Sequence, residues 1–159
     1  MFKNKQKGFS LIELLIVVAI MGILSAIVLS SLGTAREKAR DARRISDVKD
    51  MAKILVLASD TGGVSVPGCT TAHALTNTCS GIAEDLGDYS DPSTVTTACA
   101  TGGAGAGACE YSISSGDGGA VATTEDYQIC FSLEYGSGDL VAGLNSVVGP
   151  VGNLVAGCL

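Results

Sequence analysis

An unbroken apolar stretch from Phe9 to Leu32 restricts the fold more than any other feature. Apart from Glu13 and small Ser and Gly residues, it contains only apolar side chains. About 20 such residues suffice to cross a bilayer as a helix. The stretch is too long for the apolar part of a secretory signal peptide, and no A-x-A-like cleavage site follows it. It therefore predicts a retained membrane anchor.

The helical pattern continues beyond the anchor as an amphipathic stem. No Pro occurs before Pro67, and Gly62-Gly63 ends the pattern. One helix from about Phe9 to Ser59 would be roughly 77 Å long at the usual rise per residue. Opposite charges lie within helical reach in Arg43/Asp47, Arg44/Asp47 and Asp50/Lys53. The apolar face is predicted from residues spaced three or four apart, namely Ala35, Ala39, Ala42, Ile45, Val48, Ala52 and Leu55.

Charge divides the chain sharply. Every Lys and Arg lies at or before Lys53, whereas 11 of the 16 acidic residues follow it. A surface this acidic repels phosphate, so direct nucleic-acid binding by this half is not expected. The low aromatic content and the absence of Trp also argue against a platform for base stacking.

Six cysteines lie in the same acidic half: Cys69, Cys79, Cys99, Cys109, Cys130 and Cys158. An even number beside a membrane segment indicates disulfides in an oxidising compartment, and buried free thiols in a cytosolic core are the alternative. A metal site fits less well, because there is no C-x-x-C and His73 is the only histidine. Six cysteines permit 15 pairings. The ten-residue separations suggest the local loops 69/79 and 99/109, which leaves Cys130 with Cys158.

The residues from 61 to 159 predict a small β-rich head. Gly, Ser, Thr and Ala are abundant, and the segment from 101 to 108 is expected to be a loop between Cys99 and Cys109. Apolar and polar residues alternate in three candidate strands, Glu110–Ser114, Tyr127–Glu134 and Leu140–Leu144, with a hairpin connection at 136–139. Neither sheet nor stem can bury its apolar side alone. The predicted fold is α+β, with a small antiparallel sheet packed on the long helix.

The N-terminal motif resembles a known family. The basic segment MFKNKQKG precedes Phe9-Ser10-Leu11-Ile12-Glu13 and the apolar helix. This pattern resembles the class III signal of type IV pilins and pseudopilins, over roughly residues 1–60. The resemblance implies that prepilin peptidase cuts after Gly8, that Phe9 becomes the N-methylated new N-terminus, and that Glu13 acts in assembly. The chain would then be a substrate of the peptidase and no enzyme itself.

The predicted organisation is a cleaved leader at 1–8, an anchor at 9–32, a stem at 33–60 and a disulfide-containing head at 61–159. A carboxylate in an apolar helix costs about 2.5–3.5 kcal/mol near the bilayer centre. Glu13 is therefore expected to have a partner, and the α-amino group of Phe9 on a neighbouring subunit fits. The alternative is a carboxylate that only reaches the membrane interface. Gly22 permits either close helix packing or a flexible point.

The orientation of the anchor is predicted by two rules that disagree. Five bases follow the anchor and three precede it, which by Lys/Arg counting places the stem in the cytoplasm. The peptidase signal requires a cytoplasmic leader, and the cysteines favour an exported head. We expect the second orientation, with a single-pass precursor in the cytoplasmic membrane and a mature extracellular filament.

The leading hypothesis is a structural subunit, a major pilin, of an extracellular type IV pilus. Its partners would be copies of itself, the peptidase, and the assembly platform with its ATPase. The alternative is a pseudopilin of a type II secretion or competence system. No cofactor is expected, although the acidic cluster Glu84, Asp85, Asp88 and Asp91 is a weak calcium candidate without EF-hand spacing. A membrane-anchored enzyme is disfavoured, because no catalytic motif accompanies His73.

Overall fold

The computed structural model describes residues 8–60, 62–101 and 109–159, with the side chains of 82–85 left out. The leader up to residue 7 and most of the predicted loop at 101–108 lie outside these ranges. The chain divides into two compact units, Met1–Arg36 and Glu37–Leu159. Each unit is described below by itself.

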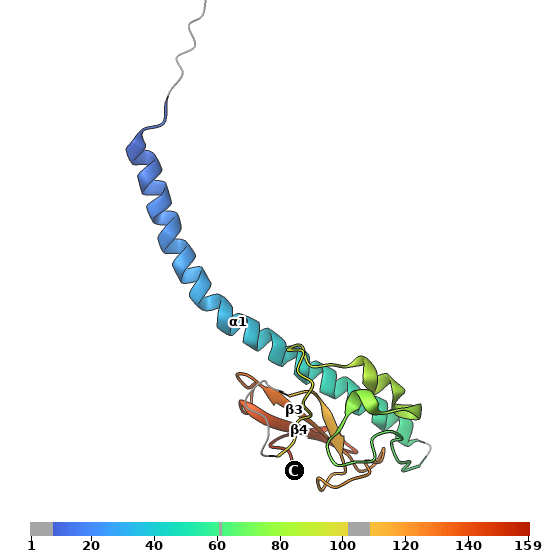
Figure 1. Ribbon diagram of the computed structural model, residues 1–159. Coiled ribbons are helices and arrows are strands. Elements are labelled where there is room, and N and C mark those ends of the chain that lie inside the picture. Colours follow the sequence, from blue (N-terminus) through green and yellow to red (C-terminus); the bar gives the residue numbers. More distant parts are fainter. Residues whose placement is uncertain (1–7, 61, 102–108) are drawn as a thin grey trace, which may run out of the picture. The chain divides into compact units, whose positions relative to one another are not determined.

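A single helix, α1, spans Leu11–Ser59 (Figure 1). It ends where the sequence predicts and begins two residues after the predicted start at Phe9. Its 49 residues contain no Pro, so no backbone donor is lost from the helical ladder. Beyond the helix, Gly62 has a φ of +89° and donates its N–H to the carbonyl oxygen of Ser59 at 2.8 Å. A glycine with this conformation is a common way to end a helix.

The larger unit also contains a five-stranded antiparallel sheet. Its strands pair in chain order, which gives β1-β2-β3-β4-β5. Two 3₁₀ segments, η1 (Thr76–Thr78) and η2 (Gly81–Asp88), connect β1 to the following loop. The strands are β1 (Ala74–Leu75), β2 (Ser112–Ser114), β3 (Gln128–Leu133), β4 (Gly143–Val148) and β5 (Asn153–Ala156). The structure thus confirms the α+β fold class.

The strand boundaries differ in part from those predicted. The first two candidates contain β2 and β3, but β4 spans Gly143–Val148, so the predicted start at Leu140 and the predicted end at Leu144 are both wrong. The segment before it turns instead, because Ser137 and Leu140 exchange backbone hydrogen bonds of 3.1 Å. The strands β1 and β5 were not predicted, since both are short and alternate weakly.

The core joins the last turns of α1 to one face of the sheet (Figure 1). At the beginning of the predicted apolar face, the buried side of the helix differs from the prediction by one position. Ala35, Ala39 and Ala42 are exposed, and Ile45 is half-buried. In their place two charged residues are buried. The complete buried set on α1 is Asp41, Arg44, Val48, Met51, Ala52 and Leu55.

The second face of β3 is also buried, although the sequence predicts only one buried face. Every residue of β3 is buried. On the second face lies a smaller cluster made of four cysteines, with Leu144 packed against it. The three disulfides are Cys69–Cys79, Cys99–Cys109 and Cys130–Cys158, which is the pairing that the spacing favours. In this glycine-rich region, which has few large apolar side chains, the disulfides hold the segments together in place of hydrophobic packing.

Candidate assembly site

The first turn of α1 brings together two residues of the N-terminal motif. The backbone N–H of Ser10 donates a hydrogen bond of 2.9 Å to Oε2 of Glu13. This is one half of a capping box, in which a Glu three residues into a helix satisfies a free N–H at its start. The partial positive charge of the helix N-terminus also favours a carboxylate here. Glu13 therefore has a local partner within its own chain.

The residues flanking the predicted cleavage point are accessible. Gly8 is exposed, and the Phe9 side chain is 86% exposed. Both precede the first residue of α1, so the bond between them is not part of the helix. An exposed bond outside the helix is accessible to a peptidase.

The apolar side chains of the anchor are exposed along its whole length. An 18-residue window of α1 reaches a mean hydropathy of 2.8 with none of its residues buried, so the helix is long and apolar enough to cross a membrane. At Gly22, a methyl group in place of the hydrogen would meet no atom within 4 Å. Among the described residues, no neighbouring side chain or segment therefore requires glycine at this position.

In the larger unit, a buried ion cluster surrounds Arg44. Its guanidinium group is fully buried and contacts three carboxylates. The distances are 3.0 Å to Asp41, 2.5 and 3.0 Å to the two oxygens of Asp91, and 2.7 Å to Glu134. Arg40 also binds Glu134 through both of its carboxylate oxygens. These contacts join α1 to the loop before β2 and to the end of β3.

Asp41 extends the cluster to the backbone. Its two oxygens accept hydrogen bonds from the N–H groups of Glu134, Tyr135 and Gly136 at 2.8, 2.8 and 3.1 Å. The chain that leaves β3 is thereby held against the stem. A buried carboxylate that has lost its water is stable only with such donors.

The pKa values in the cluster follow from these contacts. Hydrogen bonds from Arg40, with further help from Arg44, lower the pKa of Glu134 to about 2. Burial alone would lower the pKa of Arg44, but the hydrogen bonds to Asp91 and Glu134 outweigh it and raise this pKa above its usual value. Both groups therefore stay charged through the whole physiological range.

A second polar contact lies one turn further along α1. The Tyr111 hydroxyl donates to Oδ2 of Asp47 at 3.1 Å, and burial raises the pKa of both groups. Of the predicted ion pairs, Arg43–Asp47 and Lys53–Asp50 form, at 3.7 and 2.7 Å. The predicted Arg44–Asp47 pair is wrong, because Arg44 points into the cluster with Asp91 and Glu134.

The proposed calcium ligands do not lie in one exposed group. Asp91 is buried and already binds Arg44, whereas Asp88 is exposed. The side chains of Glu84 and Asp85 lie outside the described part of the structure. The calcium hypothesis therefore has to rest on residues other than Asp91.

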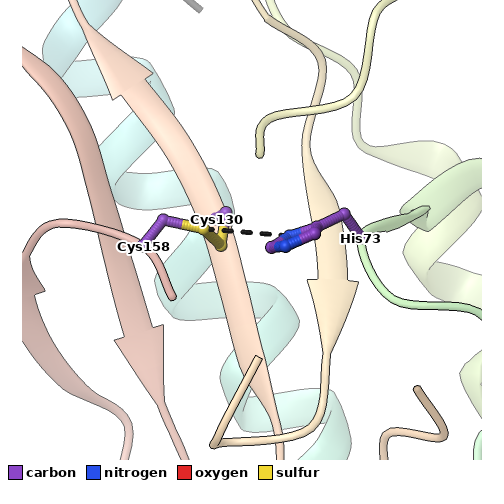
Figure 2. A group of neighbouring side chains, drawn as sticks. All are labelled: His73, Cys130 and Cys158. Atoms are coloured by element: carbon purple, nitrogen blue, oxygen red, sulfur yellow. Dashed lines mark hydrogen bonds between the residues drawn. A yellow bond between two sulfur atoms is a disulfide. The ribbon is translucent and has the colours of Figure 1, made fainter. Parts of the chain in front are cut away.

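His73 lies beside the Cys130–Cys158 disulfide (Figure 2). Its Nδ1 atom is 4.0 Å from Sγ of Cys158, and its φ of +52° is unusual for a residue other than glycine. The three side chains have potential metal-binding atoms within 4.8 Å of one another. A thiolate is the form that binds zinc, and both sulfurs are consumed in the disulfide. While the disulfide is formed, neither sulfur is available as a thiolate ligand.

The sequence alone predicts the long apolar helix and the N-terminal motif, but it does not predict the ion cluster. Asp41 and Arg44 are three residues apart on one helix face, which is the only local signal of their pairing. The partners Asp91 and Glu134 are 47 and 90 residues away in sequence. No periodic pattern connects residues at such separations.

Comparison with known proteins supports the class that the anchor and head define. Residues 3–29 match the family model of the prokaryotic N-terminal methylation motif. The chain is 34% identical over 125 residues to the type IV major fimbrial protein FimA of Dichelobacter nodosus, which covers 77% of this chain and 72% of that protein. This chain therefore belongs to the type IV pilin and pseudopilin family.

Two shorter matches point to the pseudopilin side of the family. The chain is 40% identical over 48 residues to the type II secretion system core protein G of Aeromonas hydrophila, and 38% identical over 45 residues to that of Escherichia coli K12. These matches span only about a third of each relative, 34% and 31% respectively. No solved structure matches the chain.

Proposed function

We propose that this chain is the structural subunit, a major pilin, of an extracellular type IV pilus. The observation that carries the proposal is the match to a major fimbrial protein, which extends over 77% of the chain and so includes much of the head. The exposed apolar anchor supports it, because 24 residues of apolar surface must be covered by lipid or by other copies. The chain has no catalytic task in this proposal.

In this proposal the anchor changes its surroundings during assembly. Prepilin peptidase removes residues 1–8 and methylates Phe9 on the cytoplasmic side of the membrane. The assembly platform and its ATPase then move the subunit from the membrane into the filament. Glu13 pairs with the α-amino group of Phe9 on a neighbouring copy, which offsets the cost of carrying a carboxylate into an apolar helix bundle.

The experiment is imaging of filaments sheared from the cell surface, followed by mass spectrometry of their subunits. We expect abundant fibres whose main subunit begins with N-methylated Phe9 and contains the three disulfides. A chain that still begins at Met1, or that occurs only in the membrane, would contradict the proposal. The same spectra test cleavage and composition together.

The second candidate is a pseudopilin of a type II secretion system. It is favoured by the two matches to core protein G, whose identities of 40% and 38% exceed that of the fimbrial match. A deletion strain distinguishes the two. Loss of surface fibres with normal protein secretion supports the pilin, whereas loss of secretion without loss of fibres supports the pseudopilin.

A further inference from the structure

An exposed apolar groove lies where the last turns of α1 meet the β4–β5 turn. It has a volume of about 770 Å³. Its two most prominent side chains, Leu57 and Val151, are 74% and 79% exposed. We call it the stem-end groove, and its lining residues are Lys49, Ala52, Lys53, Val56, Leu57, Pro150, Val151 and Gly152.

The rim of the stem-end groove is positively charged, whereas the chain that follows Lys53 contains acidic residues and no Lys or Arg. Lys49 and Lys53 are the last two bases in the sequence, and 11 acidic residues follow them. Lys53 is paired with Asp50, whereas Lys49 forms no ion pair among the residues that the structure describes. An apolar segment with an acidic residue is therefore the complement of this groove. In a second copy, any charged residue after Lys53 is acidic.

The loop between β3 and β4, residues 134–142, has this composition. Val141 is 51% exposed, and Asp139 is also exposed. The aromatic ring of Tyr135 is covered on one side by the Lys38 ammonium group, 4.4 Å from its centre. Tyr135 is itself 55% exposed, but one side of its ring is already in contact with Lys38, so we assign the apolar contact of the 134–142 loop to Val141.

The 134–142 loop is held rigidly from both ends. On the β3 side, Asp41 binds three consecutive backbone N–H groups. On the β4 side, the Asn145 side chain accepts from the N–H of Val141 at 3.1 Å and donates to its carbonyl oxygen at 2.8 Å. A segment fixed before binding loses little conformational freedom when it docks.

The loop and the stem-end groove lie at opposite ends of the same antiparallel ladder. The β3–β4 pairing runs from Gln128↔Val148, next to the groove, to Leu133↔Gly143, next to the loop. Six residue pairs at the usual strand rise separate the two ends by roughly 17 Å. One copy can therefore offer its loop to a second copy while its own groove receives a third.

We propose that the 134–142 loop of one subunit docks in the stem-end groove of the next. Val141 packs against Leu57 and Val151, and Asp139 pairs with Lys49. Because the two surfaces differ, the contact is heterologous, and its repetition generates an open chain of subunits unless the rotation closes a ring. The inference rests on the proposed function and adds to it the surfaces through which heads recognise each other.

The first experiment is charge reversal in the full-length chain. We expect Lys49→Glu and Asp139→Lys each to reduce the yield of sheared filaments about tenfold at an unchanged subunit level, because like charges then meet in the contact. The double variant restores the opposite pairing and recovers at least half of the wild-type yield. Asp88→Lys is the control, since this exposed acid lies outside both surfaces and should assemble normally.

The second experiment does not depend on variants that alter charge. A photo-crosslinking amino acid in place of Val151 is activated in intact filaments, and the crosslinked peptides are identified by mass spectrometry. A crosslink to the segment containing Asp139 and Val141 of another copy supports the proposal. A crosslink to the anchor, residues 9–32, of another copy would overturn it.

The outcomes separate this inference from the proposed function. Wild-type filaments together with normal assembly of Lys49→Glu and Asp139→Lys would overturn the docking contact and leave the pilin assignment intact. A double variant no better than the single ones would also overturn it. Absence of the chain from any wild-type filament would overturn the proposed function, and the docking contact with it.

Discussion

At the scale of single residues, Arg44 contributes most to the unit formed by residues 37–159. It is a fully buried cation that contacts carboxylates from three segments of the chain. A buried ion pair is not in itself a strong source of stability, because both charges lose their water. Removal of one partner is costly, since the remaining charges stay buried without compensation.

We predict that Arg44→Met lowers the free energy of unfolding by about 3–5 kcal/mol, since Asp41, Asp91 and Glu134 then lack their shared cation. Urea titration of the full chain in detergent measures this. Arg43→Ala is the matched control, because its side chain is 65% exposed and its pair with Asp47 is long. It should change stability by less than about 0.5 kcal/mol. Equal losses for the two variants would contradict the role of the cluster.

Through Glu134, the free energy of unfolding depends on pH in the acidic range. Its pKa is lowered from 4.5 to about 2 in the folded chain. A lowered pKa means that the contribution of Glu134 is fully present above pH 4.5 and is lost as the pH falls towards 2. We expect the melting temperature to fall over this interval, and Glu134→Gln to show a smaller fall. The exposed Asp139→Asn should follow the wild-type curve, and a Glu134→Gln curve identical to it would contradict the assignment.

At the scale of elements, the disulfides hold segments that have little apolar surface. Cys130–Cys158 ties the C-terminal end to the central strand β3, across 28 residues. Cys69–Cys79 closes a loop with a sequence separation of 10 before the 3₁₀ segment η2. In a chain with 21 glycines, these links replace packing that larger side chains would provide.

We predict that the Cys130→Ser/Cys158→Ser double variant is less stable by about 3–4 kcal/mol, from the entropy of the longer closed loop together with the loss of the cluster on the second face of β3. The Cys69→Ser/Cys79→Ser double variant should lose about 3 kcal/mol or less. Denaturant titration of both variants compares them. A larger loss of stability for Cys69→Ser/Cys79→Ser than for Cys130→Ser/Cys158→Ser would contradict the prediction that loop length and packing on β3 determine the contribution of each disulfide.

At the scale of the whole molecule, one chain contains a segment suited to lipid and a segment suited to water. The anchor exposes its apolar side chains, and the larger unit has its own core. Exposed apolar surface of this extent is stable only when lipid or other copies cover it. A filament is one way for many copies to cover it at once.

We predict that Glu13→Ala reduces the yield of sheared filaments severalfold while membrane insertion is retained, because the variant lacks the carboxylate that is proposed to pair with the Phe9 amino group. Quantitative immunoblots of sheared and membrane fractions measure both quantities. Glu125→Ala is the control, because it makes the same chemical change at an exposed position in the larger unit. Assembly of Glu13→Ala at the wild-type level would reject the pairing.

The sequence by itself determined the long apolar segment, the end of α1 at Ser59, the N-terminal methylation motif and the α+β class. All of these depend on local order: an apolar run, a helical period, and residues adjacent in the chain. The pairing of the cysteines also followed from short separations. These local patterns can be recognised in the sequence without knowledge of the tertiary structure.

Only the tertiary structure decided which face of the stem is buried and how charge is arranged inside it. Asp41 and Arg44 occupy the stripe where alanines were expected, because Asp91 and Glu134 approach from distant parts of the chain to compensate them. It likewise decided that the stem-end groove and the 134–142 loop lie at opposite ends of one ladder. Burial of a charge depends on the partners that folding brings near it, and local sequence does not encode them.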